Sequence, residues 1–105
     1  MNLQQSELLQ ICHTLINALF NNVAFQNDKS LLYDMYWTSS FEERYDLYNK
    51  PELTIGSITH DLERLTQCLN ENNPMLEHFR YLGNILIAIA DTIQHRINQG
   101  ESIGL

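Results

Sequence analysis

The chain has 105 residues, of which 44% are hydrophobic and 18% charged, the composition of a folded globular protein rather than a disordered one. Six lysine and arginine residues against thirteen aspartate and glutamate residues give a formal net charge of −7. That charge argues against direct binding of nucleic acid or of an anionic membrane surface, both of which attract cationic proteins, and it suits a basic protein partner.

The length predicts a single domain over residues 1–105, and we expect it to be soluble and cytoplasmic. Residues 2–7 are mostly polar and contain no basic residue, so they do not resemble a secretory leader. The longest apolar run, residues 85–90, is far shorter than the ~20 residues needed to span a bilayer. Cys12 and Cys68 fall among apolar residues of predicted helices, and we interpret both as reduced core thiols.

The first predicted helix extends from about Leu3 to Asn22. Apolar residues recur at helical spacing along one broad face, and polar residues occupy the opposite face. The apolar face consists of Leu8, Ile11, Cys12, Leu15, Ile16, Leu19, Phe20 and Val23. This pattern predicts an amphipathic helix.

The segment from Ala24 to Leu53 allows two interpretations. Asp28 is a candidate cap for a short helix that would carry Leu31, Leu32, Met35 and Tyr36. The alternative is a β-strand through Tyr33–Thr38, because aromatic residues favour strands. We expect a helix, since no partner strand is evident.

A second short helix is indicated by a capping-box pattern. Ser39 or Ser40 is followed three residues later by Glu42 or Glu43. This helix would hold Phe41, Tyr45 and Tyr48 on one face and end before Asn49, Lys50 and Pro51.

Two further long helices are predicted in the second half of the chain. One extends from about Thr54, a candidate cap, to Asn72, with a narrow apolar stripe. The last begins at Pro74, with Asn73 as its candidate cap, and continues to about Gln99, where Gly100 ends it. The predicted fold class is therefore all-α: a small antiparallel bundle of three long helices, with one or two short helices between the first and the second.

Six of the ten aromatic residues lie between residues 33 and 48, interleaved with acidic side chains. Aromatic residues dominate interface hot spots, and neighbouring carboxylates attract the lysine and arginine side chains of a basic partner. The candidate protein-binding residues are Tyr36, Trp37, Glu42, Glu43, Tyr45 and Asp46. The alternative is that these rings only pack across one end of the bundle.

No catalytic, cofactor-binding or metal site is predicted, so we expect a protein that is not an enzyme. Glu42, Glu43 and Asp46, with Asp61 and Glu63, only partly match the Glu-Glu-x-x-Glu and Glu-x-x-Asp motifs of all-α nucleotide pyrophosphohydrolases. The four histidines, His13, His60, His78 and His95, lack the paired Glu-x-x-His motifs of a di-iron bundle and are interpreted as surface residues. Residues 53–62 resemble a motif, but one sequence does not assign it a role.

Three functional hypotheses follow. The first is an acidic inhibitor of the immunity or antitoxin kind, which neutralises a basic partner such as a nuclease toxin; this is an analogy at the level of fold. The second is a structural or adaptor homodimer with the last helix as its interface, because that helix is apolar on most sides. The third is the Mg²⁺-dependent pyrophosphohydrolase, which the incomplete motif disfavours.

Overall fold

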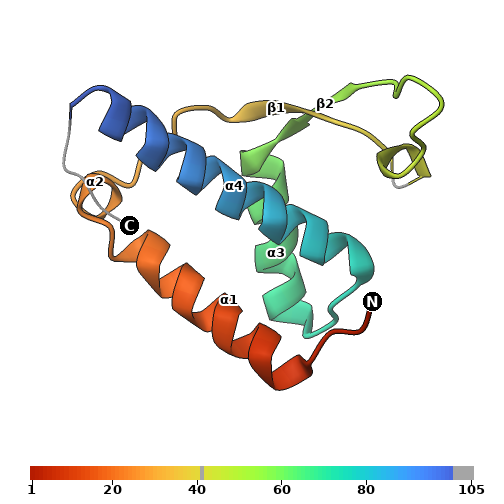
Figure 1. Ribbon diagram of the computed structural model, residues 1–105, viewed down its shortest axis with the longest axis horizontal. Helices are drawn as coiled ribbons and strands as arrows, with labels where there is room; N and C mark the ends of the chain where they lie inside the picture. Colours follow the sequence, from red (N-terminus) through yellow and green to blue (C-terminus); the bar gives the residue numbers. More distant parts are fainter. Residues whose placement is uncertain (41, 101–105) are drawn as a thin grey trace. The chain divides into compact units, whose positions relative to one another are not determined.

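The computed structural model describes residues 1–40 and 42–100 (Figure 1). The chain divides into two compact units, which are described separately. The helical unit comprises residues 1–32 and 86–100, and the sheet unit comprises residues 33–85. The longest helix, α4 (Leu76–Asn98), contributes residues to both units. The expectation of a single domain stays a prediction.

The all-α prediction is wrong, because the sheet unit contains a two-stranded antiparallel sheet. Strand β1 (Met35–Thr38) pairs with β2 (Thr54–Ser57). The register places Trp37 opposite Ile55 and Tyr36 opposite Gly56. The fold is therefore mixed, and the β-strand alternative for residues 33–38 describes this part of the chain better than the short helix we expected.

Two helices open the helical unit, α1 (Gln5–Phe20) and α2 (Val23–Gln26). The side chain of Asn22 caps α2 by accepting a hydrogen bond from the Ala24 backbone N–H at 2.9 Å. None of the residues of α1, including those of its apolar face, is buried. The buried residues of this unit are Asn22, Ala24, Phe25, Ala88, Ile89, Thr92 and Ile93.

Two side chains of α4 form hydrogen bonds with the backbone at the end of α2 and in the segment that follows it. Arg96, whose side chain is 12% exposed, donates hydrogen bonds to the backbone carbonyls of Ala24, Asp28 and Ser30. Thr92 accepts one from the backbone N–H of Leu32 at 3.0 Å. These contacts hold residues 27–32 as an irregular segment, where we expect a helix starting at Asp28 from the sequence.

The sheet unit continues from β2 directly into α3 (Ile58–Glu71), whose N-cap is Ser57 rather than the predicted Thr54. Asn72 ends α3 in the left-handed conformation, with φ 50° and ψ 46°. At the start of α4 the backbone N–H of Met75 donates to Nδ1 of His78 at 2.8 Å, and the His78 N–H donates to the Met75 carbonyl. This reciprocal pair satisfies polar groups that a helix start leaves without partners.

The second short helix is reduced to one 3-10 turn, Glu42–Arg44. The predicted capping box is present in part, since Ser40 Oγ donates to Glu43 at 2.7 Å and accepts from the Glu43 backbone N–H at 3.4 Å. Tyr45 and Tyr48 lie beyond this turn, and Phe41 lies outside the described residues.

Both cysteines are free, but Cys12 is exposed and Cys68 half-buried, so the interpretation of Cys12 as a core thiol is wrong. Among residues 1–40 and 42–100, no helix is long and apolar enough to cross a membrane.

Candidate protein-binding surface

The exposed side of the two-stranded sheet carries large apolar side chains, which we call the sheet face: Met35, Trp37 and Ile55. Side chains alternate between the two sides of a strand, so Met35 and Trp37 share one side, and Ile55 joins them as the partner of Trp37. Their exposed fractions are 67%, 67% and 61%. Together with Tyr36, they line a shallow hollow. Such a cluster is typical of an interaction surface rather than of a core.

Tyr36 lies on the opposite side of the sheet. Its hydroxyl donates to Asp61 of α3 and accepts a hydrogen bond from Asn84 of α4 at 2.8 Å. Asp61 is only 2% exposed, and this network gives its buried carboxylate polar partners. Tyr36 therefore anchors the sheet to both helices of its unit, which leaves Trp37 as the aromatic residue of β1 available to a partner.

The environment of Tyr36 favours the protonated phenol. Burial, followed by the hydrogen bond to Asp61 and the charge of its carboxylate, raises the pKa of the Tyr36 hydroxyl above its ordinary range. Ionisation would place a second negative charge beside the buried carboxylate. The hydroxyl therefore serves as a hydrogen-bond donor at neutral pH.

Asp34 joins the start of β1 to the start of α3. Its carboxylate accepts hydrogen bonds from the backbone N–H of Thr59 at 2.8 Å, the hydroxyl of Thr59 at 2.7 Å and the hydroxyl of Ser57 at 2.9 Å. The bonds from Thr59, and then that from Ser57, hold the pKa of Asp34 below its usual value. A carboxylate at a helix N-terminus is also stabilised by the helix dipole. Residues 53–62 thus have a structural role, because they form β2 and the first turn of α3 that Tyr36 and Asp34 hold.

Residues 39–53 connect β1 to β2, and we call this connection the acidic loop. Glu43 accepts hydrogen bonds from the Ser40 hydroxyl and from the backbone N–H of Glu52. Asp46 accepts from the side chain of Asn49 at 2.9 Å and from the backbone N–H of Tyr48 at 3.0 Å. These bonds lower the pKa of both carboxyls, with Ser40 the main cause for Glu43 and Asn49 for Asp46. Glu43 and Asp46 therefore shape the loop.

Two other carboxylates of the loop do not take part in such hydrogen bonds. The side chains of Glu42 and Glu52 are exposed and make no hydrogen bond or ion pair among the described residues. Leu47 and Tyr48 are also exposed, at 90% and 98%. The loop thus presents apolar side chains and unengaged negative charge together.

The six predicted binding residues all lie in the sheet unit but have different roles. Trp37 is on the sheet face, while Glu42 and Tyr45 are exposed in the acidic loop. Tyr36, Glu43 and Asp46 are engaged in internal hydrogen bonds. Two surface residues, Met35 and Ile55, and three anchoring residues, Asp34, Asp61 and Asn84, are not among those predicted from the sequence. Gly56 inside β2 was the available clue, since glycine within a strand marks a close approach.

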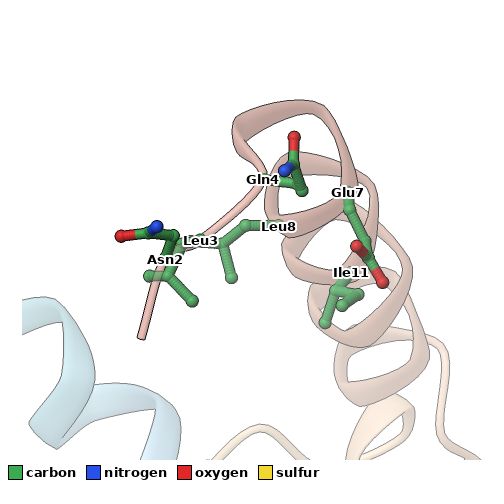
Figure 2. Close-up of a pocket in the computed structure, with 6 residues that line it drawn as sticks. All are labelled: Asn2, Leu3, Gln4, Glu7, Leu8 and Ile11. Atoms are coloured by element: carbon green, nitrogen blue, oxygen red, sulfur yellow. The ribbon is translucent and has the colours of Figure 1, made fainter.

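A second apolar surface lies on the helical unit. Figure 2 shows a shallow hollow at the start of α1, where Leu3 and Leu8 approach each other beside Ile11; Asn2, Gln4 and Glu7 complete its lining. Further along the helix, a second hollow is lined by Ile11, Leu15, Gln10 and Thr14. Neither hollow contains a cluster of ionisable groups, so neither indicates a reaction centre.

No group of three or more histidine, cysteine or acidic side chains in the described part of the chain is arranged to hold a metal ion. The pyrophosphohydrolase hypothesis needs Glu43 and Asp46 as metal ligands, but their carboxylate oxygens accept hydrogen bonds from other residues of the loop. His60 lies with Nδ1 3.8 Å from Asp61 and its ring edge against Tyr81. These contacts give no support to a metal centre.

Comparison of the chain with models of protein families, with curated proteins and with solved structures finds no match.

Proposed function

We propose that the protein is a small acidic binding protein that neutralises a basic protein partner, in the manner of an immunity protein or antitoxin directed against a nuclease. The observation that carries the proposal is the exposed pair of Trp37 and Ile55 on the sheet face, together with the unengaged carboxylates Glu42 and Glu52 in the loop that connects the two strands. Tryptophan gives large contact area at low entropic cost, and carboxylates attract a cationic partner and accelerate its association.

Charge supports a basic partner in particular. The chain carries a formal charge of −7, and four of its acidic residues lie in the acidic loop. Nucleic acid would be repelled by this surface. A nuclease is cationic where it binds phosphates, so an acidic surface with an aromatic centre is suited to covering such a site.

Co-purification provides the test. The protein is expressed together with each basic protein that a neighbouring gene encodes, and any complex is isolated through a tag on either chain. We expect a stoichiometric complex that weakens with added salt and that Trp37→Ala disrupts, while Leu3→Ala, in the helical unit, does not. If no neighbouring basic protein binds, or if Trp37→Ala binds as well as the unaltered chain, the proposal is wrong.

A homodimer formed through α4 is a second candidate. At the start of this helix Leu76 and Phe79 are exposed at 80% and 68%, and Leu82 follows one turn later. Sedimentation at micromolar concentration separates the two candidates: a dimer that Phe79→Glu converts to a monomer supports this interface, and a monomeric unaltered protein excludes it.

A further inference from the structure

The backbone groups of β1 that face away from β2 can be identified from one hydrogen bond. The backbone N–H of Ile58 donates to the carbonyl of Asp34 at 2.8 Å, and these two residues form the next pair in the register of the sheet. In antiparallel sheets, pairs that exchange hydrogen bonds alternate with pairs that do not. Tyr36 and Thr38 therefore bond to β2, whereas Met35 and Trp37 direct their N–H and C=O groups outward.

These outward groups have no partner in the described chain. No hydrogen bond among residues 1–40 and 42–100 uses the backbone of Met35 or Trp37 on that edge. Proteins normally protect a free edge with a charged side chain, a proline or a bulge. Residues 35–38 are Met, Tyr, Trp and Thr, and they include none of these devices.

At the β2 edge the chain turns into α3 directly after Ser57, so an added strand could not continue past that residue. Pro51, three residues before the strand, has no N–H to donate to a strand that continued in the other direction. The β1 edge is therefore the one suited to receive another strand. An added strand would also extend the sheet face, so that its side chains could pack beside Met35 and Trp37.

Two kinds of strand could occupy this edge, a second copy of β1 or a segment of a basic partner, and charge favours the second. Asp34 precedes β1, and Glu42 and Glu43 follow it. In an antiparallel pairing of β1 with its copy, the acidic end of each strand would meet the start of the other, in a protein that already carries −7. A segment with lysine or arginine side chains would instead meet carboxylates of opposite charge.

We infer that a partner binds by adding an extended basic segment as a third strand along the outer edge of β1. This inference rests on the proposed function and specifies how the basic partner is recognised. Backbone hydrogen bonds to Met35 and Trp37 give affinity, alternate apolar side chains pack on the sheet face, and cationic side chains reach the acidic loop.

The test uses synthetic peptides of roughly ten residues in which lysine or arginine alternates with valine, isoleucine or threonine, lengths and residues typical of a strand. Matched controls are the same peptides with glutamate in place of the cations, and with N-methyl groups on alternate backbone nitrogens. Binding is measured by fluorescence of Trp37, the single tryptophan of the chain, and by amide resonances of Met35 and Trp37.

Two substitutions at one position isolate the backbone contribution. Met35→Ala removes the side chain and keeps the N–H, whereas Met35→Pro also removes the N–H, which the β1–β2 ladder does not use. We expect Met35→Pro to bind the cationic peptides at least about tenfold more weakly than Met35→Ala, a difference of about 1.4 kcal/mol. Ile55→Pro, compared with Ile55→Ala, makes the same change on the β2 edge and should show no such difference.

A measurement on the unaltered protein keeps the test decisive if Met35→Pro does not fold. Saturation with a cationic peptide should slow hydrogen exchange at the Met35 and Trp37 amides, and the N-methylated peptide should not. Equal binding by Met35→Pro and Met35→Ala, or amides that stay unprotected in the complex, overturns the added strand. If binding still depends on the cationic side chains of the peptide, the proposed basic partner is unaffected by that result. Failure of every cationic peptide to bind, or a dimer that Met35→Pro dissociates, also overturns the added strand, and the second result assigns the edge to another copy of the chain.

Discussion

The ring of Tyr36 lies directly across Gly56, its partner on β2, so that a Cβ atom on residue 56 would stand 2.6 Å from the ring carbons and 2.8 Å from the hydroxyl oxygen. The ring cannot move aside freely, because its hydroxyl is bonded to Asp61 and Asn84. One glycine thus allows β2 to approach a tyrosine that is fixed at its other end by two helices.

This relationship predicts strong coupling between the two positions. Gly56→Ala should destabilise the unaltered protein, because the new methyl group overlaps the ring, and overpacking of this kind costs about 1–3 kcal/mol. In a Tyr36→Ala background the same substitution should be neutral or slightly stabilising, since alanine restricts the unfolded chain more than glycine does. Urea unfolding of the four proteins in the cycle measures the coupling, and additive effects would show that ring and backbone are not in contact.

The hydroxyl of Tyr36 should contribute to the free energy of unfolding separately from its ring. Tyr36→Phe keeps the ring over Gly56 but removes the donor to the buried carboxylate of Asp61, which we expect to cost about 1–3 kcal/mol. The pKa of Tyr36 is raised in the folded state, so its contribution is complete below pH ~10 and is lost as the pH rises above that value. The unfolding free energies of the unaltered protein and of Tyr36→Phe should therefore differ by a constant amount near neutrality and converge in alkali. A difference that stays constant above pH ~10 would contradict the assignment.

The contribution of Asp34 to stability should depend on pH in the acid range, whereas that of Tyr36 depends on pH in the alkaline range. Its pKa is lowered in the folded state, so its contribution is present above the ordinary pKa of aspartate and is lost as the pH falls below ~4. Asp34→Ala should lower the melting temperature at pH 7 and matter progressively less in acid. Glu63→Gln, which removes an exposed carboxylate without a hydrogen bond in the described chain, is the control and should have little effect. Equal losses from both substitutions would mean that Asp34 has no specific capping role.

We expect Arg96 to make the largest polar contribution to the stability of the helical unit. Arg96→Ala leaves the carbonyls of Ala24, Asp28 and Ser30 without their donor and should cost about 1.5–3 kcal/mol, the range for hydrogen bonds to charged groups. Arg96→Lys should lose less but still be measurable, because an ammonium cannot replace the planar fork that spans three carbonyls. Lys29→Ala, a nearby exposed cation, should be nearly neutral. Chemical denaturation of the three variants checks the order.

The long helices could be predicted because their apolar residues recur over three or more turns, and α1 and α4 begin and end within two residues of the expected positions. The sheet was missed for a physical reason. Each strand has only four residues, and Thr54 and Ser57 are both good helix caps, so β2 was read as the first turn of α3. Without β2, β1 had no visible partner.

The candidate site could be located in the chain but not resolved into roles. Aromatic crowding drew attention to Tyr36 and Trp37 together, yet neighbours on a strand point to opposite sides of a sheet. Glu42 and Glu43 likewise differ only through tertiary contacts: Glu43 reaches the Glu52 backbone nine residues away, and Glu42 makes no such contact. Sequence spacing alone does not contain those distinctions.

The central claim is that the sheet face and the free carboxylates of the acidic loop bind a basic protein. Its most direct test is titration calorimetry of a basic protein encoded by a neighbouring gene with three chains: unaltered, Trp37→Ala, and Glu42→Lys with Glu52→Lys. The charge reversal leaves Glu43 and Asp46 in place to hold the loop, so its melting temperature should change little. The account predicts that Trp37→Ala weakens binding by about 2–4 kcal/mol, and that the charge reversal weakens it steeply at low salt and less at high salt. Binding that is unchanged in both variants, or that falls only in proportion to their stability, would contradict it.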